Sequence, residues 1–386
     1  MRPTFTRIYL NNFKHNLKQI RAKLKGDTKI CIAVKADAYG HGAVECAKKA
    51  VEEGVDFLAI AAVSEGIELR NAGIKIPLLM LSLCNPDEVL TAVENDITPL
   101  VFDDEYIELF AEASRKAGRK DYKVHLAVDT GMGRIGCYPE EAGVFARKIS
   151  ESGFLKMGGI CTHFAAADSL KEEDRKYTQH QFELFLSAVE NVKKEGIDPG
   201  IRHCANSVLT LDQPEMHLDM CRPGIIAYGY YPGDMNREYF EKKGNAVDLK
   251  PVMAFVARVA AVRKFKKGKC ISYGCTWMAH EDTNIAVLPA GYADGIFRRF
   301  NQTGEGLKVA IDGKAYPVRG RICMDQCMVD LGKNTSVKRW DEAVIFGPAE
   351  SGAVVSAQEI ADATGTISYE ITCGVDKYRV PKVFVE

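Results

Sequence analysis

The segment KICIAVKADAYGHGAVECAKKAVEEGVDFLAIAAV (29–63) contains the pattern that decides the fold. Two apolar runs, KICIAVKAD (29–37) and FLAIAAV (57–63), flank the amphipathic stretch VECAKKAVEEG (44–54). Short apolar runs predict buried strands, and apolar residues three or four positions apart predict a helix. The order strand, helix, strand predicts two parallel strands joined by a crossover helix.

The same order recurs along the first two-thirds of the chain. Six further apolar runs follow: IPLLMLS (76–82), TPLVF (98–102), KVHLAVD (123–129), MGGICTHF (157–164), IRHCANS (201–207) and MCRPGIIAYG (220–229). Between two of them, QHQFELFLSAVENVKKEG (179–196) has helical periodicity and ends on a glycine. We therefore expect an α/β protein whose residues 1–240 form a (β/α)₈ TIM-like barrel. A doubly wound open sheet is the alternative, but no GxGxxG motif follows the first strand.

The pattern changes after residue 240. The polar segment EKKGNAVDLKP (241–251) ends in proline and is typical of a linker. Strand-like runs then follow at short spacing, at 252–262, 283–290, 308–313, 316–324 and 342–347, with one helical stretch at 357–365. We predict a second, mostly β domain over residues 241–386, and we expect the first residues of the chain to pair with it.

Composition excludes several classes of protein. The 386 residues include 51 Lys and Arg against 52 Asp and Glu, so no overall positive charge attracts nucleic acid or an anionic membrane. No apolar stretch approaches the roughly 18 residues of a membrane span. The start, MRPTFTRIYLNNF (1–13), lacks the apolar core of a secretion signal. We expect a cytoplasmic protein whose 12 dispersed cysteines are reduced, and no metal site, because the closest cysteine pairs have poor zinc spacing.

Lys35 is the residue in the first strand that most clearly suggests chemistry. It is the only charged residue inside the apolar run that precedes Asp37. Burial disfavours the charged ammonium, so it lowers the pKa and makes the neutral amine a nucleophile. The alternative is a strand-end lysine whose ammonium group reaches solvent.

Other polar residues follow later strands, at the end of a barrel where active sites form. A glycine-rich loop carries Arg134, and the next strand ends at His163. The last two strands lead to His203, Asn206, Ser207, Arg222, Gly224 and Ile225. Loops after these two strands often bind phosphate, for which a serine hydroxyl and the N–H groups at Gly224 and Ile225 are suitable donors. His203 could equally be a core histidine, and Arg134 a partner in a loop ion pair.

Nine motifs in one order carry a resemblance to a known family. They are AVKADAYGHG (33–42), DTGMGRIG (129–136), THFAAAD (162–168), HCANS (203–207), RPGI (222–225), ISYGCTW (271–277), GYADG (291–295), GRICMDQ (320–326) and ISYEI (367–371). Together the motifs resemble those of alanine racemases, which use pyridoxal 5′-phosphate and supply D-alanine for peptidoglycan. The resemblance implies a (β/α)₈ barrel followed by a β domain, and a homodimer in which each active site is completed by the partner's β domain.

The resemblance also implies roles for individual residues. Lys35 would bind the cofactor covalently and serve as one acid/base, and Tyr273 would be the second. The cofactor-binding set would be Lys35, Tyr39, His163, His203, Asn206, Ser207, Arg222, Gly224, Ile225 and Tyr369. The substrate-binding set would be Arg134, Tyr292, Met324 and Asp325. The last three, with Tyr273, would come from the other subunit.

Racemisation needs such a pair of groups, because a proton leaves one face of the amino acid and returns to the other. A tyrosine has a pKa of about 10, so Tyr273 would need neighbours such as Arg134 or His163 that favour its ionised form. Arg222 would face the pyridine nitrogen of the cofactor. Because arginine keeps its proton, it would leave that nitrogen largely unprotonated and so suppress side reactions such as transamination.

Two positions depart from the pattern of the family. Many members have a lysine, modified to a carbamate, two residues before the aspartate of VDTGMGR, where this chain has Ala127. Arg134 then needs another counter-charge: a chloride ion, another acidic side chain or solvent. Trp277 stands where tyrosine is frequent. Both changes bear on substrate preference.

We therefore expect an isomerase that interconverts L- and D-alanine. A serine or broad-specificity racemase of the same family is the first alternative, although Tyr292, Met324 and Tyr369 favour a small substrate. A non-catalytic carrier of pyridoxal phosphate would lack Tyr273 and the second domain. A decarboxylase with the same barrel would need different C-terminal motifs, and a barrel without a cofactor would not need the motifs at all.

Overall fold

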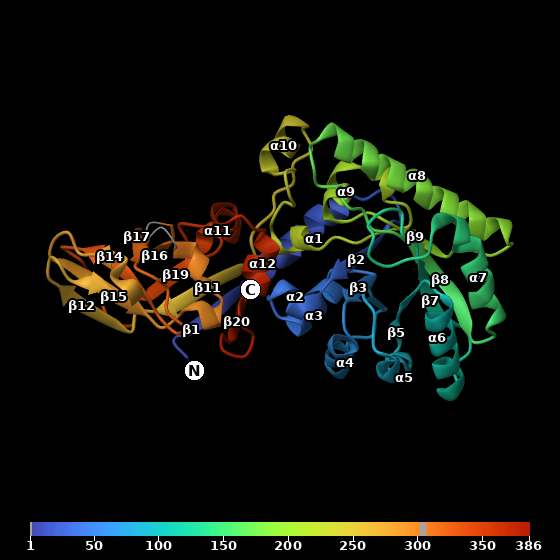
Figure 1. The fold of residues 1–386 in the computed structure, drawn as a ribbon, viewed down its shortest axis with the longest axis horizontal. Helices are drawn as coiled ribbons and strands as arrows, with labels where there is room; N and C mark the ends of the chain where they lie inside the picture. The colour runs from blue at the N-terminus through green and yellow to red at the C-terminus, as the bar shows by residue number, and fades with distance from the viewer. Residues whose placement is uncertain (1, 302–305) are drawn as a thin grey trace.

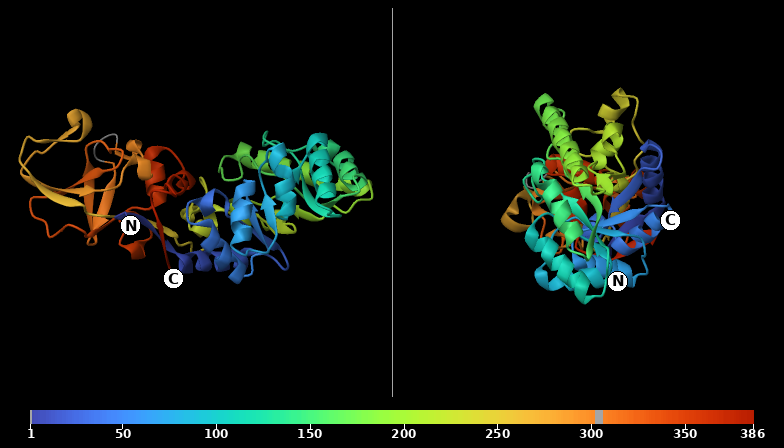
Figure 2. Two further views of the ribbon diagram at one scale, coloured as in Figure 1. Left: turned by 90° about the horizontal axis from the view of Figure 1, so that it is seen from below. Right: turned by 90° about the vertical axis from the view of Figure 1, so that its right-hand side faces the viewer.

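The computed structural model describes residues 2–301 and 306–386. Figure 1 shows an elongated molecule, with strands surrounded by helices on one side and a mostly β part on the other. Figure 2 shows the same two parts from below and end-on. Among the described residues, no helix is long and apolar enough to cross a membrane.

The strands of the first part close into a parallel barrel. Neighbours are hydrogen-bonded in the orders β10-β2-β3-β4-β5 and β6-β7-β8-β9. Pro99 separates β5 from β6, and its carbonyl accepts a hydrogen bond from His125 N on the next strand at 3.0 Å. The barrel closes where Asp219 N donates to Arg202 O at 3.1 Å. The strands are β2 (Lys29–Ala33), β3 (Phe57–Ile60), β4 (Leu78–Met80), β5 (Ile97–Thr98), β6 (Leu100–Val101), β7 (Tyr122–Ala127), β8 (Leu155–Cys161), β9 (Ile201–His203) and β10 (Met220–Cys221).

Helices alternate with these strands and cover the outside of the barrel (Figure 1). They are α1 (Leu10–Lys23), α2 (Lys35–Tyr39), α3 (Ala43–Glu52), α4 (Val63–Asn71), α5 (Val89–Glu94), α6 (Asp104–Lys116), α7 (Ala142–Glu151), α8 (Glu172–Lys194) and α9 (Ser207–Asp212). Small and apolar side chains such as Ala33, Ala59 and Ala127 fill the interior. The predicted (β/α)₈ barrel is confirmed.

The second part is built on one long sheet. Within the described residues its order is β12-β15-β18-β17-β16-β19-β11-β1-β20. These strands are β1 (Thr4–Tyr9), β11 (Met253–Arg258), β12 (Ala261–Phe265), β15 (Thr283–Leu288), β16 (Lys308–Ile311), β17 (Lys314–Arg319), β18 (Cys327–Gly332), β19 (Glu342–Phe346) and β20 (Lys382–Val385). A separate ribbon pairs β13 (Cys270–Ile271) with β14 (Trp277–Met278), and the helices of this part are α11 (Ala357–Thr364) and α12 (Ser368–Cys373). Helix α10 (Arg237–Lys242) lies on the barrel side (Figure 1), where Tyr239 Oη donates to Asp212 of α9 at 3.2 Å. The expected mostly β C-terminal part is therefore present.

Short 3₁₀ turns connect many of these elements. They are η1 (Pro86–Glu88), η2 (Pro139–Glu141), η3 (Pro214–Met216), η4 (Ile225–Tyr228), η5 (Tyr273–Cys275), η6 (Tyr292–Asp294), η7 (Arg298–Asn301) and η8 (Ala349–Ser351).

The two parts are tied together by the chain's own ends. Strand β1 pairs antiparallel with β11 and parallel with β20, so the first strand lies inside the long sheet. Helix α1 follows at once, and its Asn12 and Asn16 side chains donate to the carbonyls of Pro251 and Lys250 at 2.9 and 2.8 Å. Because α1 belongs to the barrel, these bonds fix the start of β11 against it.

Candidate active site

The turn that carries Lys35 has an unusual backbone. Strand β2 ends at Ala33, and the four residues from Ala36 to Tyr39 have φ values of 51, 55, 53 and 55°. None is glycine, so each of these left-handed residues costs about 1–2 kcal/mol. Glu65 holds the turn by accepting from Ala36 N at 2.6 Å. Strain of this kind at the end of a barrel strand is typical of functional sites.

The same turn places the Lys35 amine in a part-buried position. Burial lowers the pKa of Lys35, and the positive charge of Arg134 lowers it further. The carboxylate of Glu65 has the opposite effect on this pKa. The balance favours the neutral amine more than in a solvated lysine, as a nucleophile or a base requires.

Hydroxyl and N–H groups gather beside this turn in a cradle formed by Tyr39, Ser207, Gly224 and Tyr369. Ser207 Oγ accepts from Gly224 N at 2.9 Å, and the Tyr39 and Tyr369 rings lie 5.7 Å apart. A Cβ atom on Gly224 would lie only 2.7 Å from Tyr39 Oη, so a larger residue there would require the Tyr39 ring to move. Ile225 opens η4, and its N–H therefore has no acceptor inside that turn.

Asn206 has a supporting position at the cradle. Its side chain accepts from Leu209 N at 3.2 Å and so caps helix α9. The cap places Ser207 at the first position of that helix. Asn206 therefore stabilises the start of the helix that carries Ser207.

A chain of hydrogen bonds leads from the cradle into the barrel. Arg222 Nη1 donates to His203 Nδ1 at 2.8 Å, and His203 Nε2 lies 2.7 Å from His125 Nδ1. Burial, followed by the charge of Arg222, lowers the pKa of His125 to about 3 and that of His203 well below its usual value. Both rings are therefore neutral near pH 7. Sequence reasoning did not single out His125, whose only signal is a polar ring inside an apolar strand.

His163 lies on the other side of Arg222. Its Nδ1 is 3.4 Å from Arg222 Nη2, which also donates to the carbonyl of Thr162 at 2.8 Å. Burial and the charge of Arg222 lower the pKa of His163 to about 3. Near pH 7 this ring is a hydrogen-bonding group and carries no charge.

Arg134 is exposed, and no carboxylate pairs with it in the part of the chain that the structure describes. Its charge nevertheless reaches Lys35 and His163, whose pKa values it lowers. Ala127, which stands where the resemblance would place a lysine, is 3% exposed in the barrel interior. Among the described residues, no acidic side chain of the same subunit therefore supplies a counter-charge to Arg134. A chloride ion and solvent are the other two options.

The remaining predicted residues lie on the β part and face outward. Tyr273, Met324 and Tyr292 are 67, 52 and 38% exposed. No hydrogen bond, ion pair or ring contact among the described residues joins them to Lys35 or Arg222 of the same chain. Only Tyr369, on α12, belongs to the β part and also contacts the cradle.

The loops that carry these exposed residues are anchored by charged groups. Asp325 pairs with Arg379, whose Nε also donates to the fully buried Asp294 at 2.9 Å. Tyr292 N donates to Cys323 O at 3.0 Å, so η6 and the 323–326 loop are held side by side. Tyr273 sits in a strained loop, in which Ser272 and Cys275 have φ values of 64 and 45°.

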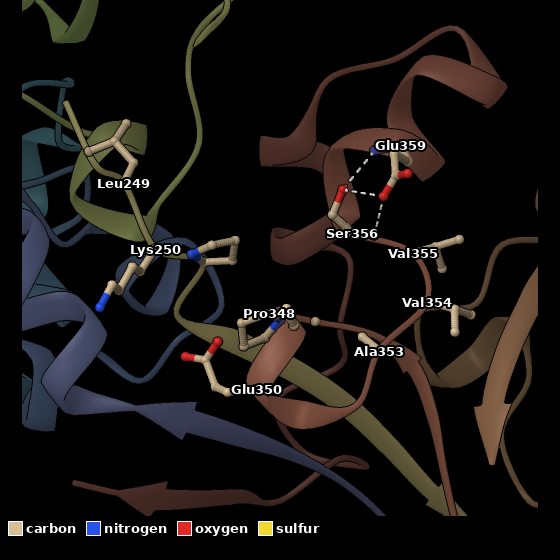
Figure 3. Close-up of a pocket in the computed structure, with 12 residues that line it drawn as sticks. Leu249, Lys250, Pro348, Glu350, Ala353, Val354, Val355, Ser356 and Glu359 are labelled. Carbon is tan, nitrogen blue, oxygen red and sulfur yellow. Dashed lines mark hydrogen bonds between the residues drawn. The ribbon is translucent and has the colours of Figure 1, made fainter. Parts of the chain in front are cut away.

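A pocket elsewhere in the molecule contains none of the predicted site residues. It lies between residues 249–251 and the turn that leads to α11 (Figure 3). Three of its polar side chains have structural partners: Ser356 and Glu359 form the capping box of α11, and Glu350 accepts from Asn12. The pocket is therefore a seam at the junction of the two parts.

Comparison with known proteins identifies the family. The sequence model described as the alanine racemase N-terminal domain matches residues 8–232, and the one for the C-terminal domain matches residues 252–384. This chain belongs to the alanine racemase family. The alanine racemase of Treponema denticola is 44% identical over 100% of this chain and 99% of its own length. That of Desulforamulus reducens is 42% identical, with 99% of each chain covered.

Solved structures of the family agree with this assignment. An alanine racemase from Clostridium difficile 630 superposes with a TM-score of 0.90 at 37% identity, covering 100% of this chain and 96% of the other. The Bacillus anthracis alanine racemase, solved with bound L-Ala-P, has a TM-score of 0.90 at 33% identity with the same coverage. The order of barrel and β sheet seen here is therefore that of the family.

Proposed function

We propose that this chain is an isomerase that interconverts L- and D-alanine, with pyridoxal 5′-phosphate bound at Lys35. The observation that carries the proposal is the strained turn at Lys35, which places an amine of lowered pKa beside the Ser207–Gly224 cradle. A nucleophilic amine next to an anion cradle fits a cofactor that has both an aldehyde and a phosphate.

The residues present fit this cofactor. The phosphate would be held by the hydroxyls of Tyr39, Ser207 and Tyr369 and the N–H groups of Gly224 and Ile225. The close approach of Tyr39 Oη to Gly224 supports this assignment, because a side chain there would fill the cradle. His163 and Arg222 would border the ring. When bound, the cofactor makes the α-proton of an amino acid acidic, because it takes up the charge left behind.

Lys35 and Tyr273 would move the proton on opposite faces of the substrate. Lys35 Nζ serves one face, since burial and the charge of Arg134 lower its pKa and favour the neutral amine that accepts a proton. Tyr273 is exposed and lacks contacts with Lys35 in its own chain, so we propose that Tyr273 of the partner subunit serves the other face. This arrangement requires a homodimer with shared active sites.

Arg222 would set the electronic state of the site. Its guanidinium keeps its proton, and its Nη1–H is already directed at the neutral His203. A group that donates without giving up its proton leaves negative charge near the substrate's α-carbon. This fits a reaction that returns the proton to that carbon.

Substrate selection would depend on Arg134 and on the exposed loops of the partner. The positive charge of Arg134 suits the amino acid's carboxylate. The N–H of Met324 and Asp325, which pairs with Arg379, would lie on the opposite side of that carboxylate. Tyr292, Met324 and Tyr369 are large, which favours alanine over serine. We place the protein in the cytoplasm, because all 12 cysteines are free and seven of the barrel's thiols are buried.

The loss of circular dichroism from L-alanine tests this proposal, with L-serine in parallel and pyridoxal phosphate supplied. We expect rapid loss for alanine and little for serine, and no loss with Lys35→Ala. Comparable loss for serine would assign the chain to the broad-specificity racemases. No loss for either, with the cofactor visibly bound, would leave a carrier of pyridoxal phosphate.

A further inference from the structure

The hydrogen-bond chain from Arg222 into the barrel has a fixed direction. Arginine can only donate, so His203 Nδ1 must accept and the neutral ring carries its hydrogen on Nε2. That hydrogen points to His125 Nδ1 at 2.7 Å, which must accept in turn. The neutral His125 therefore carries its own hydrogen on Nε2. The chain ends in a donor that needs an acceptor.

The protein supplies no such acceptor within residues 2–301 and 306–386, where the bond to His203 is the one hydrogen bond of the His125 ring. His125 is 2% exposed and its Nε2 is not sealed from solvent, so an acceptor can reach this hydrogen from outside the barrel. Strand β8 has a bulge opposite this ring, where Val124 pairs with Met157 and His125 with Gly159. The extra residue is Gly158, and a Cβ atom on it would lie 3.3 Å from His125 Nε2.

A groove lies on the other side of Gly158, at the end of the barrel opposite Lys35. Its lining includes four cations, Lys123, Lys156, Lys193 and Arg202, and two carboxylates, Asp198 and Asp219. Lys123 and Lys156 face each other in the register of β7 and β8. Neither lysine pairs with a carboxylate among the described residues.

The two carboxylates of the lining are already in use. Asp219 accepts from Arg202 Nε and Nη2 at 2.7 and 2.8 Å, which satisfies both groups. Asp198 accepts from Gly200 N at 3.0 Å and fixes its own turn. Lys123 and Lys156 therefore leave an excess of positive charge above Gly158, next to a donor that lacks an acceptor.

We propose that this groove binds a small oxyanion, of the phosphate or carboxylate class, that accepts the Nε2 hydrogen of His125 and is neutralised by Lys123 and Lys156. The missing side chain of Gly158 provides the opening between the groove and the ring. This site is separate from the cradle at Lys35 and does not depend on the proposed reaction.

Calorimetric titration of the cofactor-loaded protein with inorganic phosphate tests the site, and acetate in a second titration distinguishes the two classes of oxyanion. The bound cofactor keeps the cradle at Ser207 occupied. We expect one saturable site per chain, and about tenfold or greater weakening in the double variant Lys123→Gln/Lys156→Gln. The matched control Lys176→Gln/Lys194→Gln removes two exposed lysines from α8 that do not line the groove, and should bind as the parent protein does.

Nuclear magnetic resonance of protein with ¹⁵N-labelled histidine provides the second readout. Saturating oxyanion should shift the Nε2–H signal of His125 and slow its exchange with water in the parent protein, and not in the double variant. If that variant does not fold, Lys156→Gln alone should show a smaller loss of affinity. No saturable binding, binding of equal strength in the lysine variants, or a His125 signal unchanged at saturation would each overturn the proposal. The last two results would place the anion elsewhere, with water as the acceptor at Nε2.

Discussion

The two residues expected to move protons, Lys35 and Tyr273, both lie next to residues with left-handed backbone, but in opposite surroundings. The Lys35 turn is held by Glu65 and is covered by α12 of the same chain. The Tyr273 loop lies at the surface, and its side chain is 67% exposed. One half of the site is therefore built within a single chain, and the other half is presented outward.

The two halves differ in the contacts that hold their side chains in place. The barrel half has buried hydrogen bonds from Arg222 to His203 and from His203 to His125, so it is organised by contacts within the single chain. The outward half is ordered by its own ion pairs at Asp294 and Arg379, and Ser272 Oγ donates to Arg321 O at 2.6 Å, but no hydrogen bond, ion pair or ring contact of the Tyr273 side chain occurs in the described part of the chain. A strained backbone persists where its surroundings hold it in place. Contact with a second subunit would hold the Tyr273 loop in this way.

Removing the Lys35 amine should have the largest effect. Lys35→Ala is expected to abolish the absorbance of protein-bound cofactor and to lower racemisation by more than about 10⁴-fold, because covalent attachment and one acid/base are lost together. Both are measured on the purified variant. Lys29→Ala, at the half-exposed start of the same strand, is the control and should keep both. Residual racemisation by Lys35→Ala above a few per cent would show that the barrel half is not built around this amine.

Mixing two inactive variants tests whether the two halves belong to different subunits. Tyr273→Phe should keep the cofactor and lose about 10²–10⁴-fold in rate in the direction that uses the tyrosine. Unfolded and refolded together in equal amounts, Lys35→Ala and Tyr273→Phe should recover about a quarter of the parent activity, since half of the dimers are hybrids with one intact site each. No recovery would mean that Lys35 and Tyr273 act within one chain. The proposed division of the site between two subunits would then be wrong.

The barrel was predictable from sequence because its strands are buried on both faces. Each therefore appears as a continuous apolar run, and the eight predicted runs overlap β2 to β10. The β part was less predictable. Strands β13, β14, β18 and β20 are short or mixed in character, and they were not expected individually. Helix α10 includes the first two residues of the segment interpreted as a linker.

The site was predictable as a set of residue types and not as an arrangement. Nothing in the sequence Ala36 to Tyr39 signals a left-handed turn, because it contains no glycine. The polar ring of His125 in an apolar strand was too weak a signal, because its hydrogen bond is to His203, which is 78 residues away. The pairing of Asp325 with Arg379 is likewise long-range. Local patterns do not contain such contacts, and the residue roles assigned to the site stay predictions until they are measured.

The anchor of the outward half provides a milder test. Arg379→Ala breaks the link between Asp325 and the buried Asp294, which loosens the loops that carry Met324 and Tyr292. We expect KM for alanine to rise about tenfold, with a smaller change in kcat, because binding of the carboxylate depends on loop position. Arg379→Lys should recover part of the loss, and Arg237→Ala, on exposed α10, should change neither constant. An unchanged KM would show that the ion pairs do not position these loops.

The smallest effect concerns the buried rings that organise the barrel half. Burial lowers the pKa of His125 to about 3, whereas in the unfolded chain it is about 6.5. Below pH 6.5 the unfolded chain therefore binds a proton that the folded barrel does not, so stability falls as pH decreases. Each such histidine contributes about 1.4 kcal/mol per pH unit between those two values.

Urea unfolding of His125→Asn between pH 6.5 and 5 should show a shallower loss of stability than that of the parent protein. The exposed His180→Asn should show the parent's slope. Equal slopes for all three proteins would mean that His125 is protonated in the folded barrel. In that case the ring could not accept from His203, and the barrel half would not have the fixed hydrogen-bond direction that distinguishes it from the outward half.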